Sequence, residues 1–201
     1  MTDPDPTPES TQSRIPHQGL VLIGRELDET EWDAAVVRNE RPRHYAFDLA
    51  RTCGLEILTP AQVPPARIDR WLRILVGGRE AWALARHAAR TTRPHDFVYA
   101  TDESIGIPYL LIASHRRQRA KATAMFVLDP NLPRARFWLA VLKRLRLMPS
   151  TLITGTPETA QHLRTLLGSK ATSVDVLCLP VTIDDQFFSP APEPQPPNER
   201  P

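Results

Sequence analysis

The sequence is short of the residues that build metal and disulfide sites. It has two cysteines in 201 residues, Cys53 and Cys178, which lie far apart in apolar surroundings. Neither has a partner at metal-ligand spacing, whereas a zinc site needs clustered ligands. Five of the six histidines, His44, His87, His95, His115 and His162, show no paired ligand spacing. We therefore expect reduced, buried thiols, and the sequence implies no metal and no cofactor.

Long apolar runs and phosphate-binding motifs are also missing. No window reaches the ~18 apolar residues of a membrane-spanning helix, and the acidic start MTDPDPTPES lacks the apolar core of a signal peptide. We expect a cytoplasmic protein. No G-x-G-x-x-G follows the first apolar run, which argues against an unrelated nucleotide-binding domain of the Rossmann type. Aromatic residues make up 6% of the chain and no recognition motif appears, so we expect no nucleic acid partner.

Proline, in contrast, is abundant and concentrated at the two ends. Four of the 21 prolines lie in the first sixteen residues and six in the last twelve. Pro-rich polar segments neither form helices nor bury apolar area. The sequence therefore predicts a disordered tail over 1–18, one folded domain over 19–189 and a Pro-rich linker or tail over 190–201.

Between these ends, short apolar runs alternate with segments of helical spacing. The expected strands lie at 20–23, 55–58, 96–100, 124–128, 152–154 and 174–179. The expected helices lie at 26–39, 42–53, 68–90 with a break at Gly77-Gly78, 104–114, 132–147 and 157–167, and Pro108 predicts that the fourth begins near Ile107. This alternation is typical of an α/β fold with a doubly wound parallel sheet, that is, a Rossmann-like domain.

Three segments of the chain resemble one family. The last apolar strand opens the segment VDVLCLPVTIDDQFFSP. This segment resembles the one that closes the N-terminal domain of GT-B glycosyltransferases of family 4. Thr182 stands where that family usually has glycine. The stretches DFVYATDESIGIPYL from Asp96 and LITGTPETAQHLRTLL from Leu152 are similar to two further strand–turn–helix units of the family. The residues that fit the closing segment are Pro180, Ile183, Asp184, Phe187, Phe188 and Pro190.

The resemblance implies a function and a division of labour. It implies the single N-terminal, acceptor-side half of a GT-B fold, in an enzyme that transfers a sugar from a nucleotide-sugar donor to an acceptor sugar or lipid-linked glycan. The donor site is expected in a second domain, which is missing from this chain. The isolated chain is therefore expected to be inactive. The expected interdomain hinge contains Pro180, Thr182 and Asp184.

In open α/β sheets ligands bind beyond the carboxyl ends of the strands, and glycosyl transfer needs a base or charge-stabilising group near the acceptor hydroxyl. Asp129 is the expected catalytic residue, at a strand end where the family often has histidine. The expected acceptor-binding residues are Gly24, Arg25, Asp102, Glu103, Thr154 and Thr156.

Local structure offers an alternative interpretation of the same residues. Asp102 and Thr156 are good helix N-caps, and aspartate before proline, as at Asp129, is a good turn former. Gly24 is a lone glycine where the family has a glycine-rich loop, so the match is poor and an ordinary tight turn is the favoured interpretation.

The charge distribution is uneven. Residues 111–150 carry nine basic residues against one acidic residue, Asp129. A solvated face is the default interpretation of this basic stretch. The alternative is peripheral contact with the inner face of the membrane, because Phe137, Trp138 and Leu139 lie among the arginines of a basic amphipathic helix.

A second function remains open at this point: a non-catalytic binding module, or a partner subunit that pairs with a separate donor-domain chain. Three departures from the family pattern favour it, namely Thr182, the lone Gly24 and Asp129. In either case the apolar pair Phe187-Phe188 predicts some self-association, because it would face a second domain.

Overall fold

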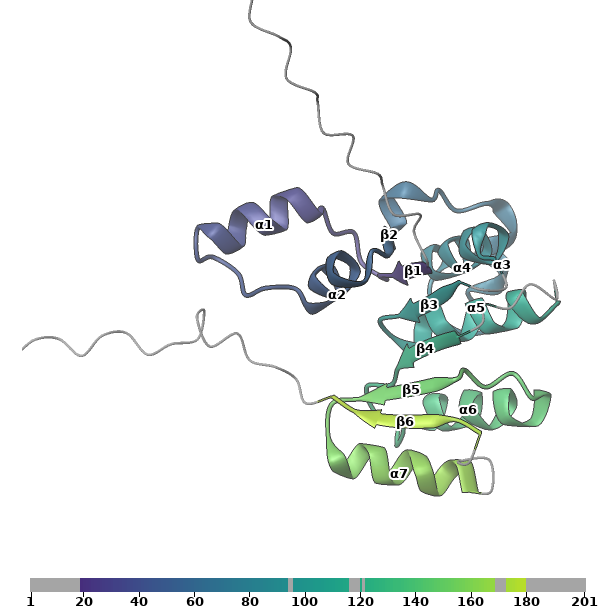
Figure 1. The fold of residues 1–201 in the computed structure, drawn as a ribbon. Helices are drawn as coiled ribbons and strands as arrows, with labels where there is room; N and C mark the ends of the chain where they lie inside the picture. The colour runs from purple at the N-terminus through teal and green to yellow at the C-terminus, as the bar shows by residue number, and fades with distance from the viewer. Residues whose placement is uncertain (1–18, 94–95, 116–119, 121, 169–172, 180–201) are drawn as a thin grey trace, which may run out of the picture.

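The apolar run at Gly19–Leu22 forms a strand that is buried along its whole length and is the second strand of the sheet. The computed structural model describes residues 19–93, 96–115, 120, 122–168 and 173–179. Within them, six parallel strands form one sheet in the order β2-β1-β3-β4-β5-β6 (Figure 1). Their bounds are β1 Gly19–Leu22, β2 Glu56–Leu58, β3 Phe97–Ala100, β4 Ala122–Phe126, β5 Thr151–Thr154 and β6 Asp175–Cys178.

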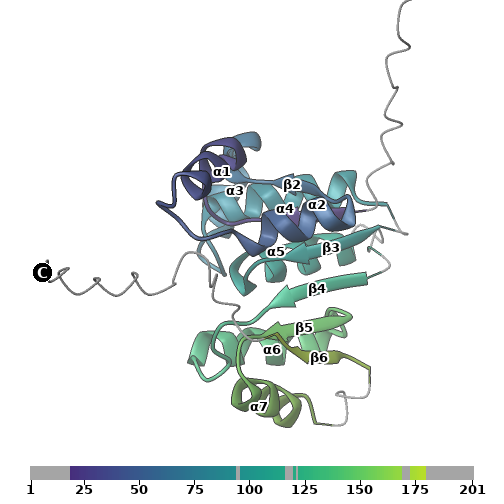
Figure 2. The same ribbon diagram turned by 60° about the vertical axis from the view of Figure 1, so that its left-hand side comes forward.

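Helices cover both faces of this sheet. Their bounds are α1 Glu29–Val37, α2 Tyr45–Cys53, α3 Arg67–Leu72, α4 Arg79–Thr91, α5 Glu103–His115, α6 Pro133–Leu145 and α7 Pro157–Leu167, with a short 3-10 turn at Pro60–Gln62. One core cluster joins α2 to one face of the sheet, and a larger cluster joins α4, α5, α6 and α7 to the other. Figure 1 shows α1 and α2 apart from α4 and α5, and Figure 2 shows β3, β4, β5 and β6 side by side. The predicted doubly wound, Rossmann-like α/β fold is therefore confirmed.

The position of α2 was predicted, but its buried side was not. The helix ends at Gly54, which has φ 63°, as expected of a helix-stop glycine. It packs on the sheet through Ala46, Phe47 and Ala50. Cys53 is therefore exposed, and the expectation that both thiols are buried is wrong, since Cys178 is only half-buried.

The expected break at Gly77-Gly78 separates two helices, α3 and α4. Gly78 is the residue before the first turn of α4, whose alanine-rich side is buried against the sheet and α5. The spacing of Ile68, Trp71 and Leu75 marks the outward side of α3, because all three side chains are exposed.

Pro108 does not delay the start of α5, contrary to the prediction. The helix begins at Glu103 and runs through the proline. An internal proline costs a helix ~3 kcal/mol because one hydrogen bond is lost. Burial of Ile105, Ile107 and Leu110, which are at most 2% exposed, offsets this cost.

Helix α6 is amphipathic, but its apolar side faces inward. Trp138 and Leu139 are 9% and 6% exposed and belong to the core, whereas Phe137 is 59% exposed. Two of the three side chains expected to contact a membrane are thus internal. Among the described residues, no helix has both the length and the apolar character needed to cross a bilayer.

Candidate functional site

The carboxyl ends of β1, β3 and β4 meet at one edge of the sheet. The chain leaves β1 toward β2 on one face, and it leaves β3 toward β4 on the other, so the two loops diverge at this point. Such a divergence opens a crevice in doubly wound sheets. Thr101 ties the two strand ends together, because its N–H and its Oγ1 both donate to the carbonyl oxygen of Leu22, at 3.1 and 3.0 Å.

Gly24 lies against the first turn of α5. A Cβ at Gly24 would lie 2.8 Å from Cδ1 of Ile105 and 3.1 Å from Oδ2 of Asp102. Any larger residue would have to displace one of them. The structure therefore brings together Gly24 and Asp102, two of the predicted acceptor-binding residues that are 78 positions apart in the sequence.

Asp102 caps α5. Its Oδ1 accepts the backbone N–H of Ser104 at 2.8 Å and also the Ser104 hydroxyl, which is the contact of an N-cap side chain with the second helical residue. The alternative interpretation of Asp102 as a helix cap is confirmed. Oδ2 lies on the Gly24 side.

Glu103, the first residue of α5, lies next to Asp102 at this edge of the sheet. Its side chain is half-buried, and Oε2 accepts the backbone N–H of Leu128 at 3.4 Å. Burial raises the pKa of the Glu103 carboxyl above its ordinary value of 4.5, and the negative charges of Asp102 and Asp129 act in the same direction. Hydrogen bonds from its own backbone N–H and that of Leu128 oppose the shift. The pKa of the Glu103 carboxyl is thus shifted in the direction that suits a general base or acid.

Asp129, the predicted catalytic residue, follows β4 and lies close enough to Glu103 to repel its charge. It is half-buried, and its Oδ1 accepts the backbone N–H of Asn131 at 2.8 Å. This contact is an Asx turn, which accounts for one carboxylate oxygen without any ligand. Asp102, Glu103 and Asp129 therefore form a group of three neighbouring carboxylates, the edge acids.

The remaining predicted residues are scattered. Arg25 is exposed beside Gly24. Thr156 caps α7, because its Oγ1 accepts the N–H of Thr159 at 3.2 Å, so that alternative is also confirmed. Thr154 is completely buried, and among the described residues its hydroxyl has no hydrogen-bond partner. The predicted hinge residues Pro180, Thr182 and Asp184 lie outside the described residues.

Two tyrosines and a histidine near this edge were not predicted. Burial raises the pKa of the Tyr99 phenol, and hydrogen bonding with Tyr45 and the charge of Asp102 add to the shift. His44 precedes α2, and burial lowers the pKa of its imidazole. Tyr99 is an inward-facing residue of an apolar strand, so only its neighbours in space distinguish it from an ordinary core tyrosine.

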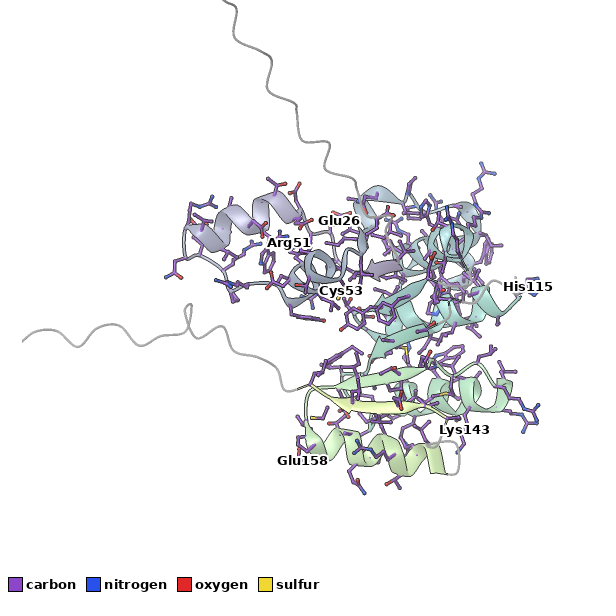
Figure 3. The ribbon with its side chains drawn as sticks, viewed as in Figure 1. Glu26, Arg51, Cys53, His115, Lys143 and Glu158 are labelled. Carbon is purple, nitrogen blue, oxygen red and sulfur yellow. The ribbon has the colours of Figure 1, made fainter. Side chains whose placement is uncertain are left out.

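Two grooves lie away from the edge acids. One, of about 480 Å³, separates α6 from α7 and is lined by leucines together with Arg136, Lys143, Arg144 and Arg146. The other, of about 310 Å³, lies between α1 and α2. In Figure 3, Lys143 and His115 lie toward the amino ends of the strands, whereas Glu158 lies toward their carboxyl ends. Within the described residues no three His, Cys, Asp or Glu side chains are arranged to hold a metal ion.

Comparison of the chain with models of protein families, with curated proteins and with solved structures gave no match.

Proposed function

We propose that this chain is the acceptor-side domain of a glycosyltransferase of the GT-B type. The observation that carries the proposal is the half-buried carboxyl of Glu103, whose pKa is raised by burial and by its acidic neighbours at the carboxyl edge of the sheet. The resemblance of three sequence segments to family 4 supports the same interpretation, and the all-parallel sheet is compatible with it.

The reaction needs a proton acceptor beside the acceptor hydroxyl. As the hydroxyl oxygen bonds to the anomeric carbon of the donor sugar, the bond from that carbon to the diphosphate breaks. The nucleoside diphosphate leaves with the bonding electron pair, and the hydroxyl proton passes to a base. A carboxylate with a raised pKa is a stronger base than an ordinary one. We assign this role to Glu103, with Asp129, the residue favoured by the resemblance, as the second candidate.

Gly24 and Arg25 would complete the acceptor side in this proposal. The glycine allows the loop after β1 to approach Asp102 closely, and the exposed guanidinium of Arg25 is available to hydrogen-bond sugar hydroxyls. The nucleotide-sugar donor is assigned to a second domain or a separate chain. The proposal therefore implies little or no donor binding by this chain alone.

A non-catalytic partner subunit is the second candidate function, and the geometry offers one observation in its favour. Asp102, Thr156 and Asp129 each make a local cap or turn contact, and Thr154 is completely buried. Several of the predicted site residues thus have a structural role that needs no acceptor.

Calorimetric titration with UDP-glucose and with GDP-mannose tests whether the donor binds outside this chain. The proposal predicts no measurable heat of binding for either nucleotide sugar. Tight binding of either one would overturn it. Affinity purification of the tagged chain from its native host tests the second candidate, because a partner subunit would bring a donor-domain chain with it.

A further inference from the structure

Four exposed apolar side chains lie together on α3 and the turn that follows it. Trp71 and Ile74 are each 75% exposed, Ile68 is 58% exposed and Leu75 is 49% exposed. They are spaced so that neighbours on a helical surface meet, and the turn keeps this spacing because Ile74 and Leu75 donate to the carbonyls three residues before them. We call this group, together with Arg67, Arg70 and Arg73, the α3 surface.

The polarity of α3 is inverted relative to an ordinary surface helix. Its fully buried residue is the charged Asp69, which is paired with Arg86 of α4 at 2.6 Å, whereas the apolar Leu72 is only partly buried against the core. A helix on the surface of a globular protein usually has its apolar residues on the side that faces the core and its charged residues on the side that faces solvent. The ion pair therefore holds α3 in an orientation that directs Trp71 and its neighbours away from the core (Figure 1, α3 beside α4).

The arginines of the α3 surface are exposed, and the charge of Arg73 reaches Glu80, a carboxylate that is already hydrogen-bonded to Arg79. Within the described residues, Arg67, Arg70 and Arg73 form no salt bridge within 4.0 Å, whereas the nearby Arg79 is paired with Glu80. A partner for this surface must satisfy two demands at once, because it has to receive an indole and three aliphatic side chains and also supply negative charge.

We propose that the α3 surface docks into the interfacial region of an anionic lipid bilayer. Tryptophan favours the level of the lipid headgroups, and arginines beside it pair with anionic lipid phosphates. A second copy of this chain fits less well, because a symmetric contact sets the same patch against itself and would bring six unpaired arginines together. This inference does not depend on glycosyl transfer.

The docked surface adjoins the edge acids. Gly77, just beyond Leu75, has φ 70° and approaches the first turn of α5 so closely that a Cβ there would lie 2.4 Å from the carbonyl oxygen of Ser104. Ser104 follows Glu103 directly. Docking through α3 therefore places the carboxyl edge of the sheet next to the lipid surface.

The experiment uses the full chain with vesicles of phosphatidylglycerol and of phosphatidylcholine. We expect co-sedimentation with the anionic vesicles that falls as NaCl is raised from about 0.1 M to about 1 M, because salt screens the attraction of arginine to lipid phosphate. Of the four tryptophans, Trp82 and Trp138 are buried and Trp32 is half-buried. Brominated acyl chains should therefore quench Trp71, and this readout needs no variant.

Substitutions on the surface then assign the binding. We expect Trp71→Ser to weaken binding at least about tenfold through lost apolar burial. Replacing Arg67, Arg70 and Arg73 by glutamine should weaken it about a hundredfold, since each arginine near an anionic surface contributes about fivefold. Thermal unfolding should be unchanged in both, because these side chains are exposed.

Two matched controls remove exposed apolar side chains elsewhere: Val37→Ser on α1, 86% exposed, and Phe137→Ser on α6, 59% exposed. Both should bind as the unaltered chain does. The proposal is overturned if anionic vesicles do not retain the chain at low salt, or if Trp71→Ser binds normally. It is also overturned if Phe137→Ser alone abolishes binding, or if Trp71→Ser abolishes self-association of a chain that ignores vesicles.

Discussion

Asp69 and Arg86 form a buried ion pair, with Oδ2 of the carboxylate 2.6 Å from Nη2 of the guanidinium. The Asp69 side chain is completely buried and the Arg86 side chain is 20% exposed. Asp69 also accepts the backbone N–H of Ala66 at 2.7 Å, so one carboxylate fixes both the start of α3 and its contact with α4. The outward direction of Trp71 follows from this pair.

Asp69→Ala should therefore destabilise the chain by about 3–5 kcal/mol, because it leaves the guanidinium of Arg86 partly buried without a partner. Urea-induced unfolding followed by circular dichroism gives the free energy of unfolding. The exposed pair Arg38–Glu40 provides the control, with N–O distance 2.8 Å and side chains more than half exposed. Glu40→Gln should change stability by less than about 1 kcal/mol. Equal losses in the two variants would contradict the structural role given to Asp69.

Glu103→Gln should stabilise the chain at neutral pH. The pKa of Glu103 is raised in the folded state, so the folded chain holds this proton more tightly than the unfolded chain. The free energy of unfolding then falls as pH rises from about 4.5, the ordinary value, through the raised pKa. Across that pH range the variant should be increasingly more stable than the unaltered chain, and near pH 4 the two should be equally stable. Thermal unfolding at each pH measures the difference.

Glu158→Gln is the matched control for this substitution. Glu158 is also in the first turn of a helix, but it is exposed, and a carboxylate there stabilises the helix by ~0.3–1 kcal/mol through the helix dipole. Its removal should lower stability at neutral pH. If both substitutions changed the stability at neutral pH in the same direction, burial and the neighbouring acids would not be the main influences on Glu103.

His44 should make the chain sensitive to mild acid. Burial lowers the pKa of its imidazole, the charge of Arg25 adds to the shift and Asp48 opposes it. The unfolded chain therefore takes up this proton first as pH falls below about 6.5, and the free energy of unfolding declines from there to the lowered pKa. His44→Gln should remove that part of the decline. A constant difference between variant and unaltered chain from pH 8 to pH 5 would contradict the shift.

The sequence predicted the order of strands and helices because buried parallel strands and helix stops such as Gly54 have local signatures. It did not predict which side of α2 or α3 faces the core. Cys53 was assigned to the buried side of α2, and Trp71 has the same spacing as a core residue although it is 75% exposed. The inward position is occupied by Asp69, whose partner Arg86 lies 17 residues away. A local pattern cannot identify that contact.

The site was predicted in part for the same reason. The carboxyl ends of the strands can be located from the apolar runs, so Gly24, Asp102 and Asp129 were found as candidates. The importance of Glu103 depends on its burial and on the charge of Asp129, 26 positions away. The caps made by Asp102 and Thr156 were foreseen as alternatives because capping is local.

We propose that the edge acids receive an acceptor sugar while the donor binds elsewhere. This proposal is tested by the amide chemical shifts of the isotope-labelled chain. They are followed during titration with methyl glycosides of glucose, mannose and N-acetylglucosamine and, separately, with UDP-glucose. We predict glycoside-dependent shifts centred on Gly24, Asp102 and Glu103, and none with UDP-glucose. Shifts confined to other parts of the chain, or tight binding of UDP-glucose, would overturn this proposal.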